Sequence, residues 1–435
     1  MNSILLATGA LVIFFLGYCF YSKFIAEKIY QLDPAFKTPA HRFEDGRDFV
    51  PTSKWVVLGH HFTSVAGAAP IVGPAIAIYW GWLPAILWVA LGTVFAAGVH
   101  DFGTLVLSIR NRGQSVGTLA GGLIGRRGRI LFLFIILMLV LMVNAVFAWV
   151  ISNLFISFPA SVLSVFIQIP LAVWIGYYTY RRQGSILLPS LLVLGIMYGA
   201  AVLATYVPAL QIDLVGYFGG AEAVALWGLS GTSLAFLVWI AVLMVYVYVA
   251  SVLPVWKLLQ PRDFINAQQL FVGLAILYGG LVALAPEVTA PARNPSATDV
   301  SWFPLLFITI ACGAVSGFHG LVASGTTSKQ LDRETDARFV GYLGAVGEGA
   351  LAIITILAVG TYFSSGEAFA GSYASFTAAG AGGLDAFIQG AGQLATGLWI
   401  PAEAARTIIA VIVVSFAATT LDSSVRLMRY IIAEL

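Results

Sequence analysis

Long apolar runs alternate with short polar segments along the whole chain. A helix that spans a bilayer needs about 20 apolar residues, and eleven runs approach or exceed that length. The first run has no basic leader and no small-residue cleavage site, so it is interpreted as a retained helix and not as a secretory signal. The runs predict an all-α polytopic membrane protein with spans at 4–22, 55–79, 82–109, 130–157, 159–180, 186–207, 229–254, 268–285, 302–326, 340–363 and 404–421.

The basic residues orient these spans. Lys and Arg are retained on the cytoplasmic side of membrane proteins, and 20 of the 22 in this chain fall in alternate loops on one side. Among them are Lys257 and Arg262, assigned to the loop between the seventh and eighth spans, whereas the opposite side keeps only Arg293 and Arg406. The pattern predicts an N-terminus outside the cell and a C-terminus inside.

Composition supports the membrane class and narrows the chemistry. The chain is 60% hydrophobic and 10% charged, whereas soluble domains carry about 25% charged residues. A net charge of +2 predicts no nucleic-acid partner. Cys19 and Cys312 both lie in apolar runs, which excludes a disulfide framework and a cysteine metal site. Residues 117–128 lack the Gly-Lys-Ser/Thr ending of a P-loop, which argues against ATP-driven pumping.

Two spans carry polar and helix-breaking residues at mid-membrane, in 59–70 and in 312–320. Broken helices are tolerated where they line a cavity, and a pair of opposite direction is typical of an inverted repeat. The alternative for Gly313 and Gly317 is a small-residue packing motif. The predicted substrate-binding residues are His60, His61, Ser64, Gly67, Ser316, Gly317, His319 and Ser324.

Asp101 and Glu348 lie within predicted spans and Asp422 is at the end of the eleventh. A charge at the bilayer centre costs at least about 2.5–3.5 kcal/mol. Asp101 and Glu348 are predicted proton carriers. Asp101 and Asp422 could instead be interfacial caps or salt-bridge partners of a nearby Arg, and Glu348 could make a structural hydrogen bond. His100 is interpreted as a packing residue and Asn144 as an interhelical hydrogen-bonding group.

The Gly- and Ala-rich segment 364–403 has two readings. Its apolar residues recur at helical spacing between Leu384 and Leu394. This spacing favours a re-entrant or surface-lying helical cap, while the composition fits an ordinary flexible outer loop equally well.

Several motifs resemble the carbon starvation protein A family of membrane transporters. They are residues 49–62 and 66–74, the pair Asp101-Phe102, and residues 308–319, 323–327, 336–338 and 420–422. The resemblance extends from about residue 1 to the end of the chain. It implies a multi-pass protein of the prokaryotic inner membrane that takes up peptides or pyruvate when carbon is scarce.

The resemblance also implies a fold of the leucine-transporter inverted-repeat type. Residues 1–54 would then hold the first helix and a basic loop, 55–207 a first five-helix repeat, and 208–301 two connecting helices. Residues 302–435 would form a partial second repeat, with 364–403 as its outer lid. On this analogy the eleventh span offers hydroxyls to a sodium ion. The implied ion-coupling residues are Ser415, Thr419 and Thr420, beside Asp101, Glu348 and Asp422.

Family members continue past the position of Leu435 with further spans, so two helices of the second repeat are expected to be missing. The chain would be a short variant, a truncated chain or one part of a split protein. A homo-oligomer or a partner chain could supply the missing helices.

Together these observations predict ion-coupled symport of a small carboxylate solute, with H⁺ or Na⁺ as coupling ion, no cofactor and no enzymatic activity. Solute and membrane lipid are the expected partners. The alternative is a membrane redox, metal-binding or haem-binding protein that uses the intramembrane histidines. Against it, His60 and His61 are adjacent and point about 100° apart on a helix. A starvation sensor or a passive channel is a third possibility.

Overall fold

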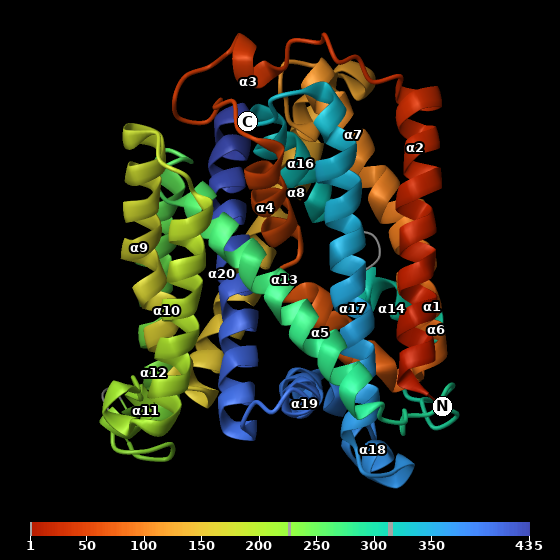
Figure 1. Cartoon of the computed structure of the whole chain (residues 1–435), viewed down its shortest axis with the longest axis vertical. Coiled ribbons are helices and arrows are strands. Elements are labelled where there is room, and N and C mark those ends of the chain that lie inside the picture. Colours follow the sequence, from red (N-terminus) through yellow and green to blue (C-terminus); the bar gives the residue numbers. More distant parts are fainter. Residues whose placement is uncertain (1, 225–227, 312–315) are drawn as a thin grey trace.

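The chain folds into a helical bundle, seen in a computed structural model that describes residues 2–224, 228–311 and 316–435 (Figure 1). Within those residues there is no β-sheet, only isolated bridges. The helices are α1 (Ser3–Leu16), α2 (Ser22–Phe24), α3 (Pro39–Arg42), α4 (Lys54–Val65), α5 (Ala69–Ala77), α6 (Trp82–Gly92), α7 (Gly98–Arg110), α8 (Val116–Ser157), α9 (Ala160–Arg182), α10 (Leu187–Tyr206), α11 (Leu214–Tyr217), α12 (Gly231–Val252), α13 (Leu259–Leu284), α14 (Trp302–Thr309), α16 (Gly317–Gly325), α17 (Leu343–Tyr362), α18 (Gly366–Ser372), α19 (Phe376–Thr396) and α20 (Ala402–Glu434).

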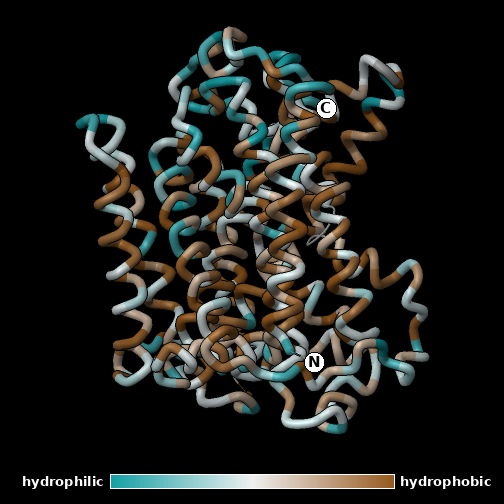
Figure 2. The backbone as a smooth tube through the Cα atoms, turned by 45° about the vertical axis from the view of Figure 1, so that its right-hand side comes forward, coloured by the Kyte–Doolittle hydropathy of each residue, from teal (hydrophilic) through white to brown (hydrophobic). Residues whose placement is uncertain are grey.

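The all-α membrane class is confirmed. Within the described ranges, nine helices are long and apolar enough to cross a bilayer, or ten if the bent pair α4–α5 is one span. The predicted span 302–326 corresponds to α14 and α16. Of its proposed break at 312–320, residues 312–315 lie outside the described residues, and α16 begins at Gly317. Apolar residues dominate the middle of the bundle and polar residues its ends (Figure 2).

The two ends of the bundle differ in charge. Figure 1 places the C-terminus, α3 and the end of α7 together, and the N-terminus, α18 and α19 at the opposite end. We call the first the basic end. Its loops are tied together, because the Val50 N–H donates to the Lys329 carbonyl at 3.3 Å and the Arg426 guanidinium lies 3.0 Å from the Asp48 carboxylate. Loops predicted to share one side of the membrane therefore meet.

The second predicted span is broken as expected. Helix α4 ends at Val65, α5 begins at Ala69, and the two axes differ by 42°. Pro70 suits the first turn of α5, where a missing N–H breaks no helical hydrogen bond. A Cβ on Gly67 would overlap the Thr420 hydroxyl, so this glycine lets α20 approach the break.

Helix α20 is the central element. It is 33 residues long and packs along α8, with α10, α12, α13 and α19 also against it. The partner helix α8 bends at Gly125, whose φ of 76° suits a residue without a side chain. The spanning part of α8 is therefore 124–157.

Segment 364–403 is helical. Helix α19 is seen end-on between the lower ends of α17 and α20 in Figure 1, so it lies across the N-terminal end of the bundle. Phe387, Ile388 and Leu394 are buried on its inner face, which packs on α5, α13, α17 and α20. The helical reading is confirmed over the flexible loop.

The boundaries predicted around α13 were wrong. The predicted span began at residue 268, but α13 begins at Leu259, so Arg262 belongs to a buried helix and not to a loop. Its side chain is 1% exposed. The first part of α13, residues 259–267, contains buried polar residues that lower its mean hydropathy. The hydropathy pattern therefore assigned this part to a loop. Helix α13 runs obliquely across the bundle in Figure 1 and packs on α4.

The crossing of α13 and α19 provides a stability test with a neighbouring control. A Cβ on Gly280 would overlap the Leu394 carbonyl oxygen, whereas one on Gly279 would make an ordinary 3.4 Å contact with Leu398. Overpacking of this kind costs about 1–3 kcal/mol. We expect Gly280→Ala to lower the apparent unfolding temperature in detergent by a few degrees. Gly279→Ala should leave it unchanged or raise it, because alanine favours helix. Equal effects of the two substitutions would contradict this packing.

Candidate functional site

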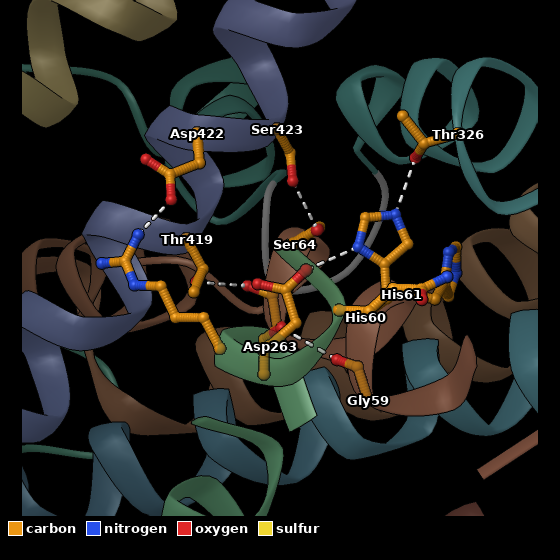
Figure 3. A network of polar contacts seen from close by, with 12 residues as sticks. Gly59, His60, His61, Ser64, Asp263, Thr326, Thr419, Asp422 and Ser423 are labelled. Atoms are coloured by element: carbon orange, nitrogen blue, oxygen red, sulfur yellow. Dashed lines mark hydrogen bonds and ion pairs between the residues drawn. The ribbon is translucent and has the colours of Figure 1, made fainter. Parts of the chain in front are cut away.

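A buried polar cluster lies where α4, α13, α16, α17 and α20 meet. Its centre is the pair His60 and His61, in the last two turns of α4 before the break, and both side chains are fully buried (Figure 3). Buried polar groups must find hydrogen-bond partners inside the protein. The partners found by each histidine define the site.

His60 links three helices. Its Nδ1 lies 2.6 Å from Asp263 Oδ2 on α13, and its Nε2 lies 2.9 Å from the Thr326 hydroxyl after α16. That hydroxyl donates its hydrogen to the Val322 carbonyl at 3.1 Å, so His60 Nε2–H is the donor toward Thr326. The Nδ1 contact therefore holds a proton that either His60 or Asp263 carries.

His61 points elsewhere. Its Nδ1 lies 3.1 Å from the Thr327 hydroxyl, while its Nε2 is buried without a hydrogen-bond partner among the described residues. The ring lies against α17, where a Cβ on Gly344 would come within 2.8 Å of His61 Cδ2. One imidazole nitrogen is thus left available inside the cluster.

Four titratable side chains from α7, α16 and α17 form a row beside His61. His100 Nδ1 lies 2.9 Å from Asp101 Oδ1, and Asp101 Oδ2 lies 2.9 Å from His319 Nδ1. His319 Nε2 in turn lies 3.3 Å from Glu348 Oε2. The His100 side chain is 38% exposed and the other three are at most 1% exposed. Asp101 is a buried hydrogen-bond partner of two histidines, so within the described residues it is neither an interfacial cap nor a salt-bridge partner of an Arg. His100, interpreted from the sequence as a packing residue, also contacts the Asp101 carboxylate.

The break itself is held by α20. The Thr420 hydroxyl donates to the Ser64 carbonyl at 3.1 Å, and the Thr419 hydroxyl lies 3.2 Å from the Thr63 carbonyl. Ser64 and Ser423 hydroxyls are 2.8 Å apart. These bonds supply donors to carbonyls that the interrupted helix leaves without helical partners. Further along α20, the Ser415 hydroxyl has no hydrogen-bond partner within the described part of the chain.

An ion pair lies behind the cluster. Arg262 on α13 pairs with Asp422 on α20, and the Tyr246 hydroxyl donates to Asp422 Oδ2 at 2.7 Å. Arg262 and Asp422 are each 1% exposed. The salt bridge to an Arg that the sequence left open for Asp422 is therefore present.

The remaining predicted residues lie around this cluster with different roles. Ser316 and Gly317 begin α16. The Ser324 hydroxyl donates to the Gly320 carbonyl at 2.7 Å and accepts from the Val116 N–H at 3.2 Å, so it faces the start of α8. Asn144 accepts a hydrogen bond from Ser424 on α20, as expected for an interhelical contact.

Sequence reasoning missed the contribution of α13. Asp263 and Arg262 bind His60 and Asp422, and Asn266 donates to the Ser415 carbonyl at 3.4 Å. A signal was present, because Gln260, Asp263 and Asn266 recur every three residues and so share one helix face. A polar stripe inside an apolar protein indicates buried partners.

Comparison with known proteins identifies the family. Residues 2–379 match the family described as Carbon starvation protein CstA. The chain belongs to this family.

Curated relatives of this chain are named as transporters. A peptide transporter CstA from Campylobacter jejuni is 36% identical over 382 residues, which cover 84% of this chain and 52% of that protein. The pyruvate/proton symporter BtsT of Escherichia coli is 35% identical over 384 residues, covering 84% and 50%. The E. coli peptide transporter CstA is 36% identical over 379 residues, covering 84% and 52%. The chain spans about half the length of these relatives, and no solved structure matches it.

The ion pair of α13 and α20 yields a second prediction. Removing one partner of a buried pair leaves an uncompensated charge, at about 3–5 kcal/mol. We expect Arg262→Met to lower the apparent unfolding temperature strongly, and Arg262→Met combined with Asp422→Leu to recover much of the loss. The matched control is the exposed pair Arg406–Glu403, where Glu403→Gln should have little effect. If Arg262→Met is as stable as Glu403→Gln, the pair does not anchor these helices.

Proposed function

We propose that this member of the carbon starvation family imports a small carboxylate solute, pyruvate or a small peptide, across the cytoplasmic membrane, driven by an ion gradient. The observation that carries the proposal is the break between α4 and α5, flanked by two buried histidines and bound by α16 and α20. Irregular backbone at membrane depth is characteristic of solute sites in secondary transporters. The names of the relatives indicate the solute class.

The proposed architecture is an inverted repeat of the leucine-transporter type with the N-terminus outside. Helices α4–α5 would be the first broken span, and α14 with α16 its inverted mate. Helix α19 would act as the outer lid over the break. The gathering of basic loops at the end opposite the N-terminus supports this orientation.

His61 is the proposed solute contact. If the Thr327 hydroxyl donates to Nδ1, the buried Nε2 carries the hydrogen and can donate to a carboxylate. The histidines and their partners are fully buried, so the site is closed in this structure. Solute entry then requires the helices around the break to move, as alternating access demands.

The row from His100 to Glu348 is the proposed proton site. Each of its three contacts can hold one hydrogen, which sits on either of the two atoms that meet there. In the starting state the hydrogens are on His100 Nδ1, Asp101 Oδ2 and His319 Nε2, and Glu348 is ionised. The hydrogens can shift along the row while all contacts persist, so Asp101 and Glu348 need not both be ionised beside a neutral His319. Such a set of groups can accept a proton while its two hydrogen bonds and the 3.3 Å contact between His319 and Glu348 persist.

Proton uptake would proceed by one shift along every contact. A proton binds Nε2 of His100, whose Nδ1–H moves to Asp101 Oδ1. The hydrogen on Asp101 Oδ2 moves to Nδ1 of His319. The hydrogen on Nε2 of His319 then moves to Glu348 Oε2, so the row gains one proton and Glu348 becomes neutral.

Sodium is the other candidate ion. Carbonyl oxygens of Thr63 and Ser64 meet the hydroxyls of Thr419 and Thr420 at the break, and oxygen sets of this kind suit a hard cation. The Thr420 hydroxyl now donates to the Ser64 carbonyl and would have to turn to admit the ion, whereas the Thr419 hydroxyl can donate to the Phe416 carbonyl at 2.9 Å and offer a lone pair. The name of the E. coli relative BtsT, a pyruvate/proton symporter, favours the proton.

Uptake into proteoliposomes tests the function. We expect labelled pyruvate or a labelled dipeptide to accumulate above equilibrium when a proton gradient is imposed, with a sodium gradient as the second arm and protein-free liposomes as background. His61→Ala should reduce uptake at least about tenfold, equivalent to 1.4 kcal/mol. His41→Ala, at an exposed histidine that contacts Asp332, is the matched control and should transport normally. Absence of accumulation of either solute by folded protein would refute the proposal.

Glu348→Gln separates coupling from binding. The amide keeps the shape of the side chain but cannot take up a proton, so proton-driven accumulation should be largely lost. Solute counterflow, which needs no net proton movement, should fall far less. Glu367→Gln, in the first turn of α18, is the control and should accumulate solute normally. If Glu348→Gln still accumulates solute against the proton gradient, Glu348 is not the proton acceptor.

A further inference from the structure

A second feature lies away from the polar cluster, on the outer face of the bundle at the N-terminal end. A cavity of about 850 Å³ runs between α6, the loop before α14, and α14 itself. Its lining includes Leu83, Leu87, Trp88, Arg293, Trp302 and Phe307. The walls are apolar, and the cation of Arg293 lies at the mouth.

The length of the groove matches one leaflet. Its α6 wall extends from Leu83 to Leu91 and begins next to Trp80. The ten residues from Trp82 to Leu91 span nine helical steps, a rise of about 14 Å, which is close to half of a hydrocarbon core about 30 Å thick. Leu83, Leu87 and Leu91 recur every four residues and are 36–49% exposed, so they form one open line along α6.

Backbone hydrogen bonds hold the loop that carries Arg293 against the start of α6. The N–H groups of Trp82 and Leu83, free at the start of α6, donate to the Pro291 and Ala292 carbonyls at 3.2 and 3.1 Å. Gly81, with φ of 111°, lets the chain pack there. These bonds fix the backbone at Arg293 level with the first turn of α6, where a candidate membrane span begins. The start of a span is the depth at which lipid headgroups are expected.

The charge at the mouth is positive. Within the described residues, Arg293 makes no ion pair, whereas Arg406, the other basic residue predicted on this side, pairs with Glu403. The carboxylate of Asp299 accepts hydrogen bonds from the Tyr79 hydroxyl and the Phe376 N–H, which lower its pKa and keep it ionised. It faces those two donors and makes no ion pair with Arg293 among the described residues, so the guanidinium of Arg293 is left to an anionic ligand.

We propose that this groove binds one anionic phospholipid of the leaflet at the N-terminal end. An acyl chain lies along the α6 leucines against the aromatic wall, where the Trp88 and Phe307 rings meet edge-on at 4.9 Å. The headgroup phosphate pairs with Arg293. Tryptophan and arginine at this depth are the side chains that membrane proteins use at the headgroup boundary.

Native mass spectrometry of the purified chain tests the headgroup. Phosphatidylglycerol and phosphatidylcholine with the same acyl chains are supplied together, and the lipid retained is identified. We expect about a fivefold preference for phosphatidylglycerol in the unmodified protein. Arg293→Gln should abolish the preference, and Arg406→Gln should keep it. Equal retention of the two lipids, or equal behaviour of the two variants, would overturn the proposal.

A second pair of variants tests the groove. Leu87→Trp fills it and should reduce retention of both lipids several-fold. Leu107→Trp places the same side chain at an exposed position of α7 outside the groove and should have no effect. If both substitutions leave retention unchanged, the bound lipid lies elsewhere. If Leu87→Trp displaces lipid that showed no headgroup preference, the occupant is an uncharged apolar molecule.

Discussion

A helix that is interrupted inside a membrane must find partners for its freed backbone groups within the protein, because lipid offers none. The break between α4 and α5 is the point where this constraint acts most strongly. Helix α20 meets it with the Thr420 hydroxyl, which donates to the Ser64 carbonyl, and with the Thr419 hydroxyl, whose single hydrogen is shared between the Thr63 and Phe416 carbonyls. Gly67 allows this approach. These contacts hold α20 against the end of α4, next to the two histidines.

The same constraint explains why charged groups occur here in connected sets. A buried imidazole or carboxylate is tolerated when each of its polar atoms is satisfied, and partially satisfied networks are costly. His60 therefore binds Asp263 and Thr326, and Asp101 binds two histidines. Within the described residues the network is not fully satisfied, because Nε2 of His61 and Oδ1 of Asp263 are buried without a hydrogen-bond partner. The imidazole nitrogen, which can donate a hydrogen to a carboxylate, is the atom assigned to the solute.

The break and its histidines could be predicted from the sequence, because Gly, Pro, His and Ser stand out within an apolar run. The helix α19 could also be predicted, because its apolar residues recur at helical spacing. The sequence did not identify Asp263 or Arg262 as site residues, since an average of hydropathy over 20 residues treats a buried polar stripe as a loop. Nor could it pair Asp422 with Arg262, which are 160 positions apart. Such pairings depend on how α13 crosses the bundle, and that is decided by tertiary packing.

The strengths of these contacts suggest which parts move. Each hydroxyl-to-carbonyl bond at the break contributes about 0.5–1.5 kcal/mol, so α4 and α20 can part there for a few kcal/mol, the range that a bound ligand can supply. Separating Arg262 from Asp422 would strand a buried charge at about 3–5 kcal/mol. Helices α13 and α20 are therefore expected to stay together while α4 and α16 rearrange around the solute. Because His60 bonds to both α13 and α16, any such motion must change the partners of the proton between His60 and Asp263.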